Sequence, residues 1–332
     1  MTASRRSFVL AVGSLAVASV LPFLGMEVLP FGVVFDPGGD SVASVIFWQI
    51  RLPRVLAALL AGAGLAVGGA AFQALFRNPL ATPYTLGVAS GAAFGVALAT
   101  RLGLSAAVFG VAFDSVAGLS GALVAVAVVW LLYRMRPSTS TMVLLLAGVA
   151  MSFFFSSLIL FLQYTATLGD SYRIVRWLMG GLAGVGVREV VHMLPFVAVG
   201  LTALMWRARE LDLLTTGADL AASRGVDVIR SRKMVFLAAS FMVGGIVAAC
   251  GPIGFVGLMA PHICRLVVGA EHRLLLPASL VFGGVFLAVC DTAARMVMAP
   301  VELPVGVITA FLGGPFFLWL LLRRSGFVQD GS

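Results

Sequence analysis

The chain has 332 residues, of which 61% are hydrophobic and 11% are charged, and its formal net charge at pH 7 is +8. A soluble domain of average composition is about half apolar and about a quarter charged, so this composition predicts an integral membrane protein instead. The basic residues form no dense run and do not alternate with aromatic residues, which argues against nucleic-acid binding.

The apolar stretches are hydrophobic on every face, whereas the strands of a membrane barrel would alternate apolar and polar residues. We therefore expect an all-α integral membrane protein in which residues 1–332 form a single transmembrane domain. Stretches close to the roughly 20 residues that a spanning helix needs lie at about 8–29, 54–76, 82–100, 115–133, 141–163, 190–206, 234–252, 253–268, 274–293 and 304–322. This pattern predicts about ten transmembrane helices. The break from Pro252 to Gly257 leaves nine spans with a re-entrant element as an alternative.

The stretch from Ile50 to Gly95 predicts two closely packed membrane helices. The first is uncharged from Val55 to Phe76, and the sequence Arg77-Asn78-Pro79 should end it, because proline cannot continue a helix. The second carries glycines once per turn, at Gly87, Gly91 and Gly95. Glycines at this spacing form a smooth strip on which a neighbouring helix backbone can lie closely.

Basic residues also indicate the orientation of the chain. With ten spans and an inner N-terminus, roughly twice as many Lys and Arg residues fall on the inner side as on the outer side. Both termini are therefore expected in the cytoplasm. Arg51 and Arg54 are outer exceptions, three residues apart and thus on one side of a helix. They can extend to lipid headgroups, or they can form a cationic patch for an acidic partner.

The longest polar stretch between spans lies at about 207–233 and contains signals for a short helix. Thr215 or Thr216 can cap this helix, Asp219 then falls in its first turn, and Gly225 suits the left-handed position that ends it. A short helix on the inner face of a membrane protein can dock another protein. It can equally be a connecting loop, and the spacing alone favours neither interpretation.

Polar residues inside the spans are few. Ser152, Ser156 and Gln163 fall on one face of the fifth stretch, where they can line a pathway, although serines in helices also bond their own backbone. Ionisable residues are nearly absent, with Asp291 near the end of a span, which argues against an ion-driven carrier. No phosphate-binding loop, HExxH or GxSxG motif is present, which argues against an enzyme, and no metal-ligand motif is found.

Several motifs in one order resemble the FecCD family, the permeases of bacterial ABC importers for ferric siderophores, haem and vitamin B12. The motifs are Arg51-Leu-Pro-Arg54, Gly68-Gly-x-x-Phe-Gln73 with Arg77-Asn-Pro-Leu80, Leu86-Gly-Val-x-Ser-Gly91, Trp177-Leu-Met-Gly180, Gly251-Pro-Ile-Gly-Phe-Val-Gly257 with Pro261-His262, Asp291-Thr-x-x-Arg295, and Glu302-Leu-Pro-x-Gly306-Val-x-Thr309. Together they extend over nearly the whole chain. The resemblance implies the type II ABC importer permease fold.

The resemblance also implies partners. It implies a homodimer in the bilayer, with two ATP-binding cassette ATPase subunits inside and a periplasmic or lipid-anchored substrate-binding protein outside. No cofactor is expected on this chain, because ATP and Mg would belong to the ATPase. The localisation implied is the bacterial inner membrane, and the chain itself is not expected to be an enzyme.

Site residues follow from the same resemblance. Arg51, Arg54 and Arg295 match arginines that receive acidic side chains of the binding protein. The polar turn Ser138, Thr139, Ser140 and Thr141 matches a cytoplasmic gate. The residues that match the ATPase-coupling helices are Leu214, Thr215, Thr216, Gly217, Ala218, Asp219, Ala221, Ala222, Arg224 and Gly225.

The expected mechanism is alternating access powered by ATP in the partner subunit. The substrate is expected to be a bulky metal chelate that passes through a weakly polar channel. Ferric siderophore is favoured on the abundance of such permeases in the family, and haem and vitamin B12 are the alternatives. An ion-coupled secondary transporter is the competing class of function.

Overall fold

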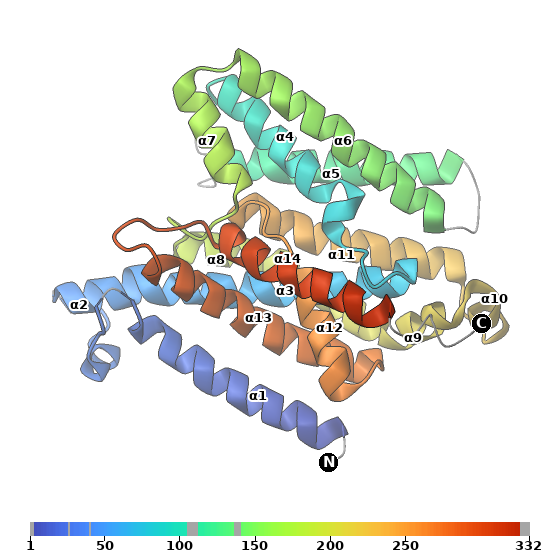
Figure 1. The fold of residues 1–332 in the computed structure, drawn as a ribbon, viewed down its shortest axis with the longest axis horizontal. Coiled ribbons are helices and arrows are strands. Elements are labelled where there is room, and N and C mark those ends of the chain that lie inside the picture. Colours follow the sequence, from blue (N-terminus) through green and yellow to red (C-terminus); the bar gives the residue numbers. More distant parts are fainter. Residues whose placement is uncertain (1–2, 26, 40, 105–111, 136–140, 326–332) are drawn as a thin grey trace.

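A computed structural model describes residues 3–325 of the chain, apart from residues 26, 40, 105–111 and 136–140. Within the described residues every regular element is helical (Figure 1). The α-helices are α1 (Ala3–Val20), α2 (Val42–Val45), α3 (Leu52–Phe76), α4 (Val88–Arg101), α5 (Phe113–Met135), α6 (Thr141–Thr165), α7 (Leu168–Leu178), α8 (Val187–Trp206), α9 (Ala208–Thr216), α10 (Ala218–Ser223), α11 (Val228–Cys250), α12 (Val256–Val268), α13 (His272–Met296) and α14 (Val305–Ser325).

The predicted spans are found in order. In the part of the chain that the structure describes, seven helical segments are long and apolar enough to cross a membrane, and the shorter apolar helices Val88–Arg101, Val256–Val268 and Val305–Leu320 account for the remaining three stretches. Helix α12 has only 13 residues, in agreement with the prediction that the eighth stretch is short. The all-α membrane fold with about ten apolar helices is confirmed.

Several predicted boundaries differ from the structure, and two of these differences have a clear local reason. The second span begins earlier than residue 54, because α2, a π-helical segment at Ile46–Arg51 and α3 form one continuous helical stretch, Val42–Phe76. The third span is shorter than 82–100, because Pro83–Leu86 form a 3-10 turn and Gly87 has a φ of 79°. Helix α4 therefore has 14 residues.

Helix α3 lies at the centre of the molecule, where it contacts α13, α11, α12 and α8 (Figure 1). Small residues let these backbones approach closely. A Cβ on Gly283 of α13 would lie 2.7 Å from the Gly62 carbonyl oxygen of α3, and a Cβ on Gly257 of α12 would lie 2.7 Å from the Leu65 carbonyl oxygen. The backbones of α3 and α13 are therefore in direct contact.

Two of the three predicted strip glycines, Gly91 and Gly95, pack against α5, whereas Gly87 precedes α4 and faces α6. A Cβ on Gly91 would lie 2.6 Å from the Gly121 carbonyl oxygen of α5, so the α4 and α5 backbones are in direct contact. Helix α3 ends at Phe76 with Arg77 in the left-handed conformation, φ 51°, before Pro79. The end of the first helix and its close-packed successor are confirmed, except that Gly87 lies outside the second helix.

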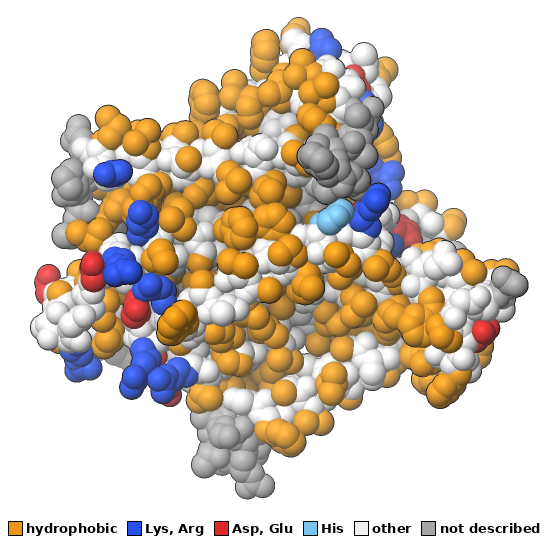
Figure 2. Space-filling view, turned by 180° about the vertical axis from the view of Figure 1, so that it is seen from behind, with side chains coloured by type: hydrophobic (Ala, Val, Ile, Leu, Met, Phe, Trp, Pro, Cys, Tyr) orange, Lys and Arg blue, Asp and Glu red, His pale blue; other side chains and the backbone are white. Residues whose placement is uncertain are grey.

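The molecule has two polar ends. The start of α1 and the end of α14 lie at the same end of the molecule as α9 and α10, and this end is called the coupling end (Figure 1). The outer surface between the ends is largely apolar, and many Lys and Arg side chains gather at the coupling end (Figure 2). On α6, Phe153 and Phe161 are 72% and 64% exposed, which suits contact with lipid.

Candidate docking and coupling sites

The end of the molecule opposite the coupling end is called the arginine end. It is built by three segments that are distant in the sequence. Arg54 lies in the first turn of α3, Asp291 and Arg295 lie one turn apart near the end of α13, and Glu302 lies in the segment before α14. Because α3 and α13 pack against each other, Arg54 meets Asp291 across 237 residues of sequence.

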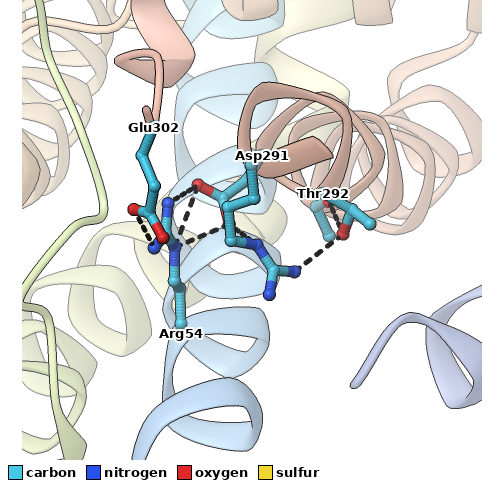
Figure 3. Close-up of polar contacts among 6 residues, drawn as sticks. Arg54, Asp291, Thr292 and Glu302 are labelled. Carbon is cyan, nitrogen blue, oxygen red and sulfur yellow. Dashed lines mark hydrogen bonds and ion pairs between the residues drawn. The ribbon is translucent and has the colours of Figure 1, made fainter. Parts of the chain in front are cut away.

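Arg54 bonds two carboxylates on two sides of its guanidinium group (Figure 3). Its Nε and Nη2 donate to Asp291, at 2.9 Å to Oδ2 and 3.0 Å to Oδ1, and its Nη1 donates to Glu302 Oε2 at 2.8 Å. The contact with Asp291 is therefore bidentate, which is the strong geometry for an arginine and a carboxylate.

Arg295 lies on the other side of Asp291. Its Nε is 3.4 Å from Asp291 Oδ2, and its Nη2 donates to Thr292 Oγ1 at 3.1 Å. Asp291 thus lies between two arginines. A carboxylate that is 1% exposed would be very unfavourable without such partners.

Arg51 makes a different set of contacts. Its Nη1 donates to the Phe23 carbonyl oxygen at 3.0 Å, and its Nη2 donates to the Glu27 carbonyl oxygen at 2.8 Å. These bonds hold the chain that follows α1 against the start of α3. In this conformation Arg51 therefore stabilises the packing of that segment.

All three predicted docking arginines are buried, with exposed fractions of 8% for Arg51, 6% for Arg54 and 7% for Arg295. Their burial disfavours the alternative in which Arg51 and Arg54 extend to lipid headgroups. The structure brings Arg54 and Arg295 together around Asp291 and holds Arg51 on backbone carbonyls. Their role in docking stays a prediction.

A cavity of about 400 Å³ opens beside Arg54 and Glu302. Further charged and aromatic residues on its wall are Asp114, Arg173, Arg176, Trp177 and Glu189. Its wall therefore carries both basic and acidic side chains, close to the buried ion pairs of the arginine end.

Helix α7 borders this cavity and has no counterpart among the predicted spans. Thr167 caps it by accepting a bond from the Asp170 backbone N–H at 3.2 Å, and Asp170 also pairs with Arg173 at 2.5 Å. The hydrogen bond from Arg173, together with one from Thr167, lowers the pKa of Asp170 below its usual value. A capping threonine with an acidic residue three positions later was the sequence signal for this helix.

Helices α9 and α10 occupy the predicted coupling segment. The residues Thr215, Thr216, Asp219, Ala222, Arg224 and Gly225 are exposed, Gly217 and Ala218 are half-buried, and Leu214 and Ala221 are buried. The two buried residues anchor the pair of helices while the exposed ones remain accessible. Their role in ATPase coupling stays a prediction.

The predicted cap of this segment is wrong. Thr215 and Thr216 end α9, where their hydroxyls donate to the Asp212 and Leu213 carbonyl oxygens at 2.6 and 2.8 Å. Helix α10 is instead preceded by Gly217, whose φ of 125° lets the chain turn between the two helices. Gly225, with a φ of 83°, follows α10 as predicted.

Helix α9 is attached to two membrane helices. Asp212 Oδ1 accepts the backbone N–H of His272 at 2.9 Å and lies 2.6 Å from the Nδ1 atom of the same residue. Glu210 accepts a bond from the Ser231 hydroxyl of α11 at 2.6 Å. Because His272 is the first residue of α13, Asp212 caps that helix from α9.

The predicted pathway residues lie on α6. The Ser152 hydroxyl donates to the Gly148 carbonyl oxygen at 3.0 Å and lies 3.4 Å from that of Tyr84, which agrees with backbone bonding. Ser156 is exposed and Gln163 is half-buried. Their role in lining a pathway is not tested by these contacts.

The predicted gate is only partly within the described residues. Ser138, Thr139 and Ser140 lie outside them, and Thr141 is the first residue of α6. Among the residues that the structure describes, no three His, Cys, Asp or Glu side chains gather in a way that could hold a metal ion.

The fold and both polar ends can now be compared with known proteins. A model of the FecCD transport family matches residues 8–323 of the chain. The chain belongs to the FecCD transport family. The resemblance drawn from its motifs is therefore confirmed over almost its whole length.

Two relatives illustrate the match of this FecCD protein. The uncharacterised ABC transporter permease protein YvrB of Bacillus subtilis (strain 168) is 42% identical over 287 residues, which cover 86% of this chain and 81% of YvrB. The vitamin B12 import system permease protein BtuC of Klebsiella pneumoniae is 42% identical over 299 residues, which cover 89% of this chain and 88% of BtuC.

A solved structure has the same fold. It is described as an inward-facing conformation of a metal-chelate type ABC transporter, and it matches with a TM-score of 0.86 and 32% identity over 96% of this chain and 99% of that one. The FecCD protein is thus a multi-pass membrane protein with the fold of an ABC transporter permease. Its relatives are transport permeases, in line with the expectation that the chain is not an enzyme.

Proposed function

We propose that this FecCD permease is the transmembrane subunit of an ATP-driven ABC importer that moves a bulky metal chelate across the bacterial inner membrane. The observation that carries the proposal is the position of α13. Its first residue, His272, is capped by Asp212 of α9, and near its last turn Asp291 holds Arg54 and Arg295. One helix thus connects the surface suited to an ATPase with the surface suited to a binding protein.

The assembly would contain two copies of this chain, two ATPase subunits and one substrate-binding protein. The ATPase subunits would bind ATP and Mg and contact the exposed residues of α9 and α10. The binding protein would contact the arginine end with acidic side chains, because complementary charge guides and orients docking. Both termini and the coupling end would then face the cytoplasm.

The chain's own residues suggest how ATP binding would be transmitted. Displacement of α9 by the ATPase would act on α13 through the Asp212–His272 contact and on α11 through the Glu210–Ser231 contact. Helix α3 would follow α13, because their backbones meet at Gly62 and Gly283. The arginine end would therefore change whenever the coupling end moves, which is what alternating access requires.

The substrate class rests on the relatives. BtuC is named for vitamin B12, and the matching structure is described as a metal-chelate type transporter. A metal chelate is therefore the proposed cargo. Ferric siderophore remains the substrate favoured in the sequence analysis, vitamin B12 is favoured by BtuC, and haem is the third candidate.

Co-purification tests the proposal. The tagged chain is co-expressed with the ATPase of the same organism, and in a variant residues 215–225 are replaced by a Gly/Ser linker of equal length. We expect equal amounts of ATPase with the wild-type chain and its loss from the linker variant. Arg173→Ala, at the arginine end, is the control and should retain the ATPase.

Uptake into proteoliposomes then identifies the cargo. Vitamin B12, a ferric siderophore and haem are compared with ATP inside the vesicles, and one of them should accumulate only when ATP is present. Transport by the chain alone under an ion gradient would overturn the proposal and establish the ion-coupled alternative.

A further inference from the structure

The two carboxylates that hold Arg54 differ in how easily they can leave it. The Asp291 side chain is 1% exposed and lies between Arg54 and Arg295. If it moved away, both buried guanidinium groups would lose this carboxylate partner. The Glu302 side chain is 45% exposed and bonds only the Nη1 end of Arg54. Figure 3 shows Glu302 reaching Arg54 from a loop, whereas Asp291 comes from α13.

Hydrogen bonds fix the backbone around Glu302, whereas the Glu302 side chain is partly exposed. The Leu303 N–H donates to the Ala294 carbonyl oxygen at 3.2 Å, and the Val301 N–H donates to that of Met298 at 2.9 Å. Glu302 and Arg54 both line the cavity of about 400 Å³. Rotation of one side chain would therefore open the Nη1 end of Arg54 to that cavity.

The charges of the cluster make a replacement favourable. Arg54 and Arg295 bring two positive charges, and Asp291 and Glu302 bring two negative charges, so the four groups balance while Glu302 stays on Arg54. If Glu302 left Arg54, a carboxylate from another protein would enter a site with one uncompensated positive charge. If Glu302 stayed on Arg54, however, the incoming carboxylate would meet a like charge and no free donor at Nη1.

We propose that Glu302 is an internal competitor, which occupies Arg54 in the free permease and is replaced there by an acidic side chain of the docked binding protein. This inference rests on the proposed function and goes beyond it. Docking then exchanges one carboxylate for another at nearly constant charge. The return of Glu302 to Arg54 promotes release of the binding protein after each transport cycle.

Removal of the competing charge should strengthen docking. Glu302→Gln keeps the size of the side chain but leaves only a neutral acceptor near Arg54. We expect the binding protein of the same organism to bind the variant roughly five- to tenfold more tightly, as expected for a close charge contact at an interface, and to dissociate more slowly. The permease is measured with its ATPase in nanodiscs, with the binding protein in solution.

Asp114→Asn is the matched control. Asp114 lines the same cavity and carries the same charge, but no contact joins it to Arg54 among the described residues. If both variants tighten binding equally, the effect is general electrostatics and the proposal is wrong. Weaker binding by Glu302→Gln would also overturn it, because Glu302 would then serve to hold Arg54 in place.

A second variant protects the test against a folding defect. Glu302→Asp retains the charge on a shorter side chain that reaches Arg54 less well, so it should also bind more tightly than wild type. If the Gln variant does not assemble with the ATPase, wild-type-like or weaker affinity of the Asp variant overturns the proposal. Absence of any binding by wild type would instead refute the proposed importer, so the two failures are distinguishable.

Discussion

At the arginine end, Asp291 is the carboxylate that compensates the most buried positive charge. Asp291 accepts two bonds from Arg54 and lies 3.4 Å from Arg295, so it compensates two guanidinium groups that are both largely buried. Removing one member of a buried charge group leaves the other charges uncompensated. This destabilises a protein more than replacing the whole group by apolar residues does.

Asp291→Asn should therefore destabilise the permease by about 3–5 kcal/mol. Thermal unfolding in detergent is the measurement, and Asp114→Asn, which removes an exposed carboxylate, should change the midpoint little. The triple variant Arg54→Met with Asp291→Leu and Arg295→Met should recover much of the stability, because it removes the buried carboxylate together with both buried arginines. A similar midpoint for Asp291→Asn and wild type would show that the ion pairs are not compensating each other.

Asp212 shows how helices α9 and α13 are joined. The N-terminal residue before α13, Glu271, makes no capping bond of its own, and Asp212 of α9 supplies that bond instead. A cap supplied by a neighbouring helix ties the stability of α13 to the position of α9. The contact therefore links the coupling segment to the helix that reaches the arginine end.

Asp212→Ala should cost about 1–2 kcal/mol of stability, the usual effect of losing a capping side chain. If the contact also transmits movement, the variant should still co-purify with the ATPase and hydrolyse ATP but should show little stimulation by the binding protein. Thr202→Ala is the control, because the Thr202 hydroxyl donates to the Ala198 carbonyl oxygen within its own helix, α8. Normal stimulation in Asp212→Ala would assign the contact to stability alone.

Helices whose signal is local could be predicted from the sequence, and contacts between distant segments could not. The apolar stretches, the end of α3 at Arg77 and the contact of Gly91 with α5 follow from composition, proline and glycine spacing. The extension of α3 back to Val42 was missed because Asp36 to Ser41 is rich in turn residues and Arg51 resembles a span boundary.

The pairing of Arg54 with Asp291 depends on tertiary packing. The sequence places both residues near span ends, but 237 residues separate them and no periodicity relates one to the other. Arg51, Arg54 and Arg295 were recognised as a group only by resemblance, and their burial and the second partner of Arg54, Glu302, required the packed helices.

At the scale of the whole molecule, the two polar ends must face opposite sides of the membrane. The coupling end holds the start of α1, where Arg6 contacts the Val267 carbonyl oxygen at 3.4 Å, and the Asp212–His272 contact. The arginine end holds α7 and the cavity beside Arg54. The bias of basic residues toward the coupling end favours a cytoplasmic position for it.

Cysteine labelling can test this orientation without altering the native cysteines. Cys250, Cys264 and Cys290 are all buried, so a membrane-impermeant maleimide should react slowly with the wild-type chain. Thr215→Cys places an exposed thiol at the coupling end, and Gly169→Cys places one on α7. In spheroplasts, Gly169→Cys should be labelled and Thr215→Cys should not, whereas inside-out vesicles should give the reverse. Labelling of both positions from one side would mean that the two ends do not face opposite compartments, and α13 could not then connect an ATPase to an external binding protein.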